Sequence, residues 1–386
     1  MELLLHTPAS NSNLSVHYKK AFSNAVELFV VTAYLTDWDA TLILNSECRR
    51  FRIVIGSDFG ITRKAACEKV MRWLPRTRKS QFLVADEIEG FHPKAVFWKE
   101  KNGDCFALVG SSNLTHAAFE TNYEANVVCQ LHKTDYIKAK KWIHEIEKQS
   151  NVVSEDWLKL YKETTHQKAQ RAKRSGKVVE WGVPLINLSL PTPRGMGRLL
   201  NDRRVALMKY QEQRAPLERL FRKCASKKIS SKDFYLDLPK YWSWDVGDRL
   251  QGAGWEIKGK RSDFQTLSAS FVNILDATDE ERDDVVSEEI DHLSKKRIPT
   301  RWAFFSEMLC LRFPEAYPVM NDPVWKWLND VKYRVPRNSG EGAHFIFVAK
   351  ALRSALRQNP EHPAKNLAEL DTVIWLAYGK GSRGNV

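Results

Sequence analysis

Paired cysteines are missing from this chain of 386 residues. The six cysteines lie far apart, at Cys48, Cys67, Cys105, Cys129, Cys224 and Cys310. This spacing excludes a disulfide scaffold and favours buried thiols in a reducing cytoplasm. The N-terminal cysteines, together with His6, His17 and His132, also lack the paired spacing of zinc ligands, so we expect no metal site and no cofactor.

Long apolar runs are missing as well. Stretches such as Leu28–Val31 fall far short of the roughly 20 residues that a membrane-spanning helix needs. The first residues, Met1–His6, carry no basic segment of a secretory signal. We therefore expect a cytoplasmic protein that does not engage a membrane. Hydrophobic residues still make up 43% of the chain, which is enough for cores, and the length favours two domains.

The positive charge is concentrated in one part of the chain. The formal net charge is +13, and residues 161–230 alone hold 17 basic and 5 acidic side chains. A local excess of this size attracts a polyanion such as nucleic acid, although a merely solvated helix face would have the same composition. If nucleic acid binds there, we expect phosphate contacts from Arg171, Lys173, Arg174, Arg203 and Arg204.

Residues 1–150 alternate between strand and helix patterns. Strands are expected at Glu27–Leu35, Phe51–Gly56, Gln81–Ala85, Lys94–Trp98, Cys105–Gly110 and Ala125–Leu131. Helices are expected at Tyr18–Ala25, Thr62–Leu74, Leu114–Phe119 and Thr134–Gln149. Asn102-Gly103 is a strong hairpin signal. The pattern predicts an α/β domain with a mixed sheet flanked by helices.

The rest of the chain is different. Residues 151–200 include a stretch rich in proline and glycine, which we interpret as a basic linker or arm. Residues 201–386 predict a mostly helical domain that could recognise nucleic acid or a partner. Its helices are expected at Arg203–Ser226, Asp263–Leu275, Arg301–Phe313, Gly342–Gln358 and Leu367–Tyr378. Aromatic residues around Tyr241–Trp244 and Trp255, beside basic residues, suit either stacking on bases or core packing.

The most informative window is Gly90–Val127. His92 and Lys94 are two apart on a predicted strand, so their side chains share one face of the sheet. Gly110-Ser111-Ser112-Asn113 ends the partner strand and opens a short helix, where small residues and a helix N-terminus favour an anion. Glu124 follows at the next strand.

These residue types suit phosphodiester transfer through a histidine. An imidazole is a competent nucleophile if one nitrogen is free and a carboxylate holds the other. An ammonium and an amide can neutralise the oxygens of the transition state without a metal. One such residue alone would be weak support, because a single histidine on a strand is usually structural.

The window resembles the phospholipase D superfamily signature, His-x-Lys followed by Gly-Ser-x-Asn, and most of all its nuclease branch, which includes metal-independent restriction endonucleases and helicase-associated nuclease domains. The resemblance covers residues 1–150. It implies that His92 is the nucleophile, that Lys94, Ser111 and Asn113 bind phosphate, and that Glu124 orients the histidine. The sequence departs from the full motif at Lys99, where the family has an aspartate. Several nuclease members also lack that aspartate, so the departure weakens a lipase interpretation more than a nuclease one.

The chain carries one copy of this motif. Single-copy members of the family pair two chains so that both histidines meet, and the chemistry also needs a second group to protonate the departing oxygen. We therefore expect a homodimer in which one His92 attacks and the other acts as the general acid.

The leading hypothesis is a metal-independent DNase in restriction or anti-phage defence, with a possible helicase or other defence-system subunit as partner. Phe305–Leu328 resembles helical modules of prokaryotic restriction and defence proteins. One alternative is a phospholipase or phosphatidyl transferase with the same residues, which would need an apolar interfacial surface. Another is a nucleic-acid-binding protein with a vestigial site.

Overall fold

A computed structural model describes residues 1–9, 13–164, 186–250, 259 and 261–379. The chain divides into two compact units. The first comprises Met1–Ile186 with Pro336–Ala343, and the second comprises Asn187–Val335 with His344–Val386. Each unit has its own buried hydrophobic core.

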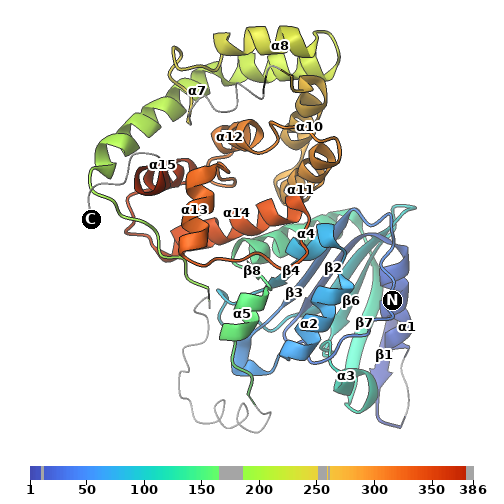
Figure 1. The fold of residues 1–386 in the computed structure, drawn as a ribbon. Coiled ribbons are helices and arrows are strands. Elements are labelled where there is room, and N and C mark those ends of the chain that lie inside the picture. Colours follow the sequence, from blue (N-terminus) through green and yellow to red (C-terminus); the bar gives the residue numbers. More distant parts are fainter. Residues whose placement is uncertain (10–12, 165–185, 251–258, 260, 380–386) are drawn as a thin grey trace. The chain divides into compact units, whose positions relative to one another are not determined.

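Within its described residues, the first unit is built on an eight-stranded mixed sheet (Figure 1). The strands are β1 (Glu2–His6), β2 (Ala25–Thr32), β3 (Arg50–Ile55), β4 (Phe82–Val84), β5 (Lys94–Glu100), β6 (Cys105–Gly110), β7 (Glu124–Leu131) and β8 (Asn151–Val152). Their order is β1-β7-β6-β5-β2-β3-β4-β8. The neighbours β2, β3 and β4 run parallel, and the other pairs are antiparallel.

The predicted mixed sheet is confirmed, and so is the hairpin between β5 and β6. Gly103 has φ +93°, a left-handed conformation that glycine adopts at little cost. The outermost strands β1 and β8 were not expected. They lie at the two edges of the sheet and are only five and two residues long, so their sequences carry little periodicity.

Helices lie on both faces of this sheet. They are α1 (Leu14–Asn24), α2 (Lys64–Trp73), α3 (His116–Glu120), α4 (Lys133–Lys148) and α5 (Glu155–Leu160), with 3₁₀ turns η1 (Asp58–Gly60) and η2 (Arg76–Gln81). Buried residues of α1, α2 and α5 share one core with alternate strand residues such as Phe51 and Ile53. Arg52 points to the opposite face, where its Nε lies 2.6 Å from a carboxylate oxygen of Glu147 on α4.

The second unit is mostly helical, as predicted. Its helices are α7 (Met196–Ala225), α8 (Ser231–Asp237), α10 (Phe264–Asp276), α11 (Asp279–Lys295), α12 (Ala303–Arg312), α13 (Asp322–Asp330), α14 (Glu341–Gln358) and α15 (Leu367–Tyr378), with the 3₁₀ turn η3 (Leu238–Lys240). Trp242 is buried in this core, whereas Trp244 is 56% exposed. Trp255 lies outside the described residues.

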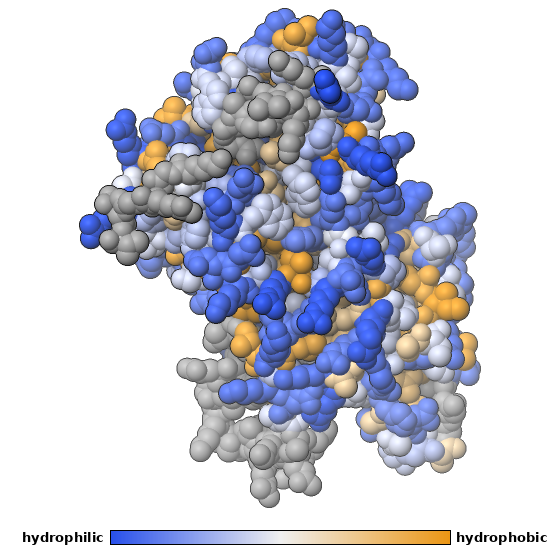
Figure 2. Space-filling view, viewed as in Figure 1, coloured by the Kyte–Doolittle hydropathy of each residue, from blue (hydrophilic) through white to orange (hydrophobic). Residues whose placement is uncertain are grey.

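The visible surface is largely hydrophilic, with scattered apolar side chains (Figure 2). None of the helices within the described ranges is both long enough and apolar enough for a membrane span.

Candidate active site

His92 and Lys94 meet at one end of the sheet. The ladder pairs Lys94, the first residue of β5, with Thr32, the last residue of β2. The Lys94 Nζ lies 2.9 Å from His92 Nδ1 and 3.4 Å from Nε2, and it donates to the His92 carbonyl at 3.1 Å. One anion placed here would touch both side chains.

The expectation that His92 lies on the strand itself was wrong by a short distance. The strand begins at Lys94, after Pro93, which has no N–H to donate to a ladder. His92 therefore belongs to the loop before β5, and its side chain is exposed.

Asn113 is held at the same end of the sheet by β2 and the segment after it. Its Oδ1 accepts from the backbone N–H of Tyr34 at 3.2 Å and from the hydroxyl of Thr32 at 3.3 Å. With the oxygen occupied, the amide nitrogen has no hydrogen-bond partner among the described residues. Asn113 can therefore offer its N–H donors to an incoming oxyanion.

Ser111 and Glu124 form a second pair beside Asn113. The Ser111 hydroxyl donates to one carboxylate oxygen of Glu124 and accepts from the Ala125 backbone N–H at 3.0 Å. The other oxygen of Glu124 accepts from Asn122 Nδ2 at 3.0 Å. These bonds fix the turn that carries the motif. The role implied for Glu124, orienting His92, stays a prediction.

Gly110 is required by the close approach of β7. A Cβ added there would lie 2.3 Å from the Ala125 carbonyl oxygen and 2.4 Å from Asn126 Oδ1. Any side chain would push the two strands apart just before Ser111. The glycine of the motif therefore sets the backbone position of the residues that follow.

Tyr34 is a site residue that the sequence did not reveal. Its ring packs edge-on against the His92 ring, with centroids 5.7 Å apart and planes at 76°. Burial, with a smaller effect of the Asp58 charge, raises the pKa of Tyr34 to about 12, so the phenol stays protonated at neutral pH. The ring limits how far the imidazole can turn.

Asp58 was also missed. It is buried, and its carboxylate accepts hydrogen bonds from the backbone N–H groups of Gly90 and Phe91, directly before His92. Burial raises the pKa of this carboxyl, against the effect of those bonds. Tyr34 and Asp58 follow the ends of the neighbouring parallel strands β2 and β3. This position in the sequence could have identified them, because site residues often follow the carboxyl ends of parallel strands.

Lys99 lies at the position where the family has an aspartate. It forms an ion pair with a residue outside the motif. Its Nζ lies 3.5 Å from Glu27, whose carboxylate also contacts Lys140 of α4 at 3.1 Å. These charges link β2, β5 and α4. Lys99, which replaces the aspartate of the family motif, is therefore part of a structural ion-pair network.

The five basic residues expected to contact phosphate fall into two groups, those outside the described residues and those in the helical unit. Arg171, Lys173 and Arg174 lie outside the described residues. Arg203 is buried and donates to Asp371, Ala368 and Leu250 within the helical unit.

Arg204, the last of these expected contacts, is partly exposed. Its Nε and Nη2 donate to the two oxygens of the buried carboxylate of Glu369, each at 3.0 Å. Its geometry is that of a structural ion pair.

Potential metal ligands do not gather in the described ranges, where no group of three or more His, Cys, Asp or Glu side chains is placed to hold an ion.

Residues 19–151 match the family model described as "Cardiolipin synthase, PLD-like domain". No curated protein matches the chain. Among solved structures, NucT from Helicobacter pylori is similar with a TM-score of 0.30 and 14% identity, over 39% of this chain and 98% of that one. Phosphatidylserine synthase from Haemophilus influenzae Rd KW20 has a TM-score of 0.30 and 16% identity, over 45% of this chain and 44% of that one. The first unit of this chain contains a phospholipase D-like domain.

Proposed function

We propose that this chain is a metal-independent phosphodiesterase that cleaves DNA through a phosphohistidine intermediate, in restriction or anti-phage defence. The observation that carries the proposal is the convergence of a histidine, a lysine and an amide at one end of the sheet. His92 and Lys94 are within hydrogen-bond distance, and the Asn113 oxygen is held by Tyr34, whose ring packs on His92.

These positions support the following chemistry. A ring nitrogen of His92 attacks phosphorus, forming an N–P bond as the bond to the leaving oxygen breaks. Lys94 and the Asn113 amide stabilise the charge on the non-bridging oxygens. The leaving oxygen takes a proton from a second imidazole. Water then attacks the phosphohistidine, gives a proton back to that imidazole and releases His92.

The second imidazole would come from another copy of the chain. An apolar row on the α4 face of the sheet supports this. Residues paired across neighbouring strands share a face, and the row runs from Val109 through Val127 to Leu3, with Leu5 beside it. Leu3 is 62% exposed, Leu5 60% and Val109 47%. Val109 directly precedes the Gly110 turn, so a copy docked on this row would lie next to the site.

A charge introduced into this row tests the dimer. Leu5→Lys should convert the protein to a monomer in sedimentation velocity and abolish cleavage, while Ile43→Lys, at a residue that is 75% exposed elsewhere in the unit, should change neither. A Leu5→Lys variant that stays dimeric and active would remove this interface. Loss of binding to anionic lipid vesicles by the same variant would favour the phosphatidyl transferase alternative.

A basic groove of about 640 Å³ in the first unit supports a nucleic-acid substrate. It is lined by more basic than acidic side chains: Lys64, Arg72, Lys79, Lys159 and Arg337 against Glu68 and Glu155. The groove starts near the site, because α2 begins at Lys64 and the preceding Arg63 donates its N–H to the Leu35 carbonyl at 2.8 Å. A phosphate backbone fits this charge.

The direct test is cleavage of DNA in excess EDTA by the intact chain. We expect activity to persist, His92→Ala to abolish cleavage while leaving DNA binding nearly intact, and the exposed control His132→Ala to behave as the parent protein. Loss of cleavage in EDTA with rescue by magnesium would overturn the mechanism. Binding without cleavage by the parent protein would favour the vestigial-site alternative.

A further inference from the structure

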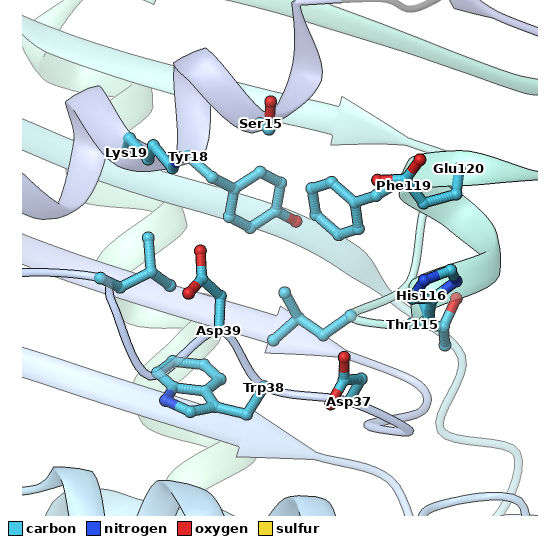
Figure 3. A pocket seen from close by; sticks show the side chains of 12 residues that line it. Ser15, Tyr18, Lys19, Asp37, Trp38, Asp39, Thr115, His116, Phe119 and Glu120 are labelled. Atoms are coloured by element: carbon cyan, nitrogen blue, oxygen red, sulfur yellow. The ribbon is translucent and has the colours of Figure 1, made fainter.

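A cavity of about 320 Å³ adjoins the Gly-Ser-x-Asn element, a size within the range of small-ligand sites (Figure 3). Its walls come from α1, from the loop after β2 and from the start of α3. The chain that carries Asn113 continues directly into the wall as Leu114, Thr115 and His116. A group bound in this cavity would therefore lie next to a phosphate held at Asn113.

Three aromatic side chains give the cavity flat apolar walls. Tyr18 and Trp38 are almost fully buried, and Phe119 is partly exposed. The Tyr18 and Phe119 rings pack edge to face with centroids 5.3 Å apart, and Trp38 is braced by Trp73 at 4.9 Å. Because the core holds these aromatic side chains in place, the cavity suits a ligand with a planar ring.

The polar lining carries mostly negative charge. The lining includes three carboxylates, one lysine and one histidine, namely Asp37, Asp39, Glu120, Lys19 and His116. A hydrogen bond from Lys69 at 2.8 Å is the main reason why the pKa of Asp37 is low, and a hydrogen bond from the Thr41 hydroxyl does the same for Asp39. The carboxylates of the cavity therefore offer acceptors to an uncharged ligand that donates hydrogen bonds.

We propose that this cavity receives an unpaired nucleobase of the substrate strand beside the scissile phosphate, and that it prefers bases with an exocyclic amino group to thymine. The inference rests on the proposed function, because only a nucleic-acid substrate brings a base to this position. Stacking against Phe119 supplies affinity, and the carboxylates near the rim, Asp39 and Glu120, supply the preference.

Nucleoside binding tests the cavity without any cleavage. Saturation-transfer NMR on the intact chain should show guanosine binding more strongly than thymidine. Phe119→Leu keeps the apolar bulk but removes the ring, and it should weaken guanosine binding at least about five-fold. Glu120→Gln should reduce the preference for guanosine, while Glu361→Gln, an exposed change in the other unit, should not.

Equal binding of the two nucleosides, no binding, or full guanosine binding by Phe119→Leu would overturn the proposal. Because nucleosides have no phosphate, these results do not depend on His92 or Lys94. A protein that cleaves DNA through His92 but ignores guanosine would refute the cavity alone. Guanosine binding without any cleavage would refute the nuclease and leave the cavity as a base site.

Discussion

Asp58 offers a sharp test of how the fold positions the proposed nucleophile, His92. Its buried carboxylate accepts the backbone N–H groups of Gly90 and Phe91, which lead directly into His92. Asp58→Ala removes both acceptors, and Asp58→Asn keeps one oxygen that can accept. We expect turnover to fall in the order parent, Asp58→Asn, Asp58→Ala.

The size of the effect follows from the contacts. Hydrogen bonds to a charged group contribute about 1.5–3 kcal/mol each, but burying the carboxyl offsets much of this. We expect Asp58→Ala to lower the free energy of unfolding by about 1–3 kcal/mol, which a folded domain tolerates. A loosened His92 loop should lower kcat roughly 10- to 100-fold with little change in KM.

The pH dependence of stability gives a second measurement. Because folding raises the pKa of Asp58, the folded state favours its protonated form. The parent protein should lose this contribution as pH rises from the usual carboxyl pKa of about 3.9 through the raised value. The stability gap between the parent protein and Asp58→Asn should therefore shrink as pH increases, as measured by urea unfolding.

The assay needs a control that loses stability without touching the site. Asp283→Asn in the helical unit serves, because this half-buried carboxylate lies 2.9 Å from Arg353 and 3.5 Å from Lys350. It should leave kcat unchanged. An Asp58→Ala protein that is folded and fully active would refute the positioning role.

Three further predictions concern other parts of the chain. Lys64→Glu with Arg72→Glu should weaken DNA binding and flatten its dependence on salt, whereas an unchanged salt slope would remove the groove from the substrate path. Gly110→Ala should abolish cleavage because its Cβ meets β7, while Gly197→Ala, with open space around it, should be silent in the same assay. Asp283→Asn should lower the free energy of unfolding, measured in urea, by about 1–3 kcal/mol. Burial alone would raise the Asp283 pKa, but Arg353 and Lys350 hold it well below its usual value, so the difference from the parent protein should fade as pH drops below about 4.

The sequence predicted best what is local. Cys105–Gly110 and Leu367–Tyr378 form the expected strand and helix with the expected bounds, because each has a clear apolar pattern closed by a glycine. The spacing of His92 and Lys94 likewise identified two side chains that do meet.

What the sequence could not show depends on distant contacts. Tyr34 donates its backbone N–H to Asn113, which lies 79 positions away, and no local sequence pattern near either residue predicts this hydrogen bond. Arg203 belongs to a basic stretch by composition, yet folding buries it against Asp371. A count of charges does not distinguish a cation that faces solvent from one that holds two helices together.

Direct detection of the covalent intermediate tests the central claim. The intact chain should be mixed with DNA in EDTA, quenched during turnover under conditions that preserve phosphohistidine, and mapped by mass spectrometry. We expect a phosphorus adduct on the peptide containing His92, absent from His92→Ala. Rapid cleavage with no phosphorus on His92 at any time point would contradict the account.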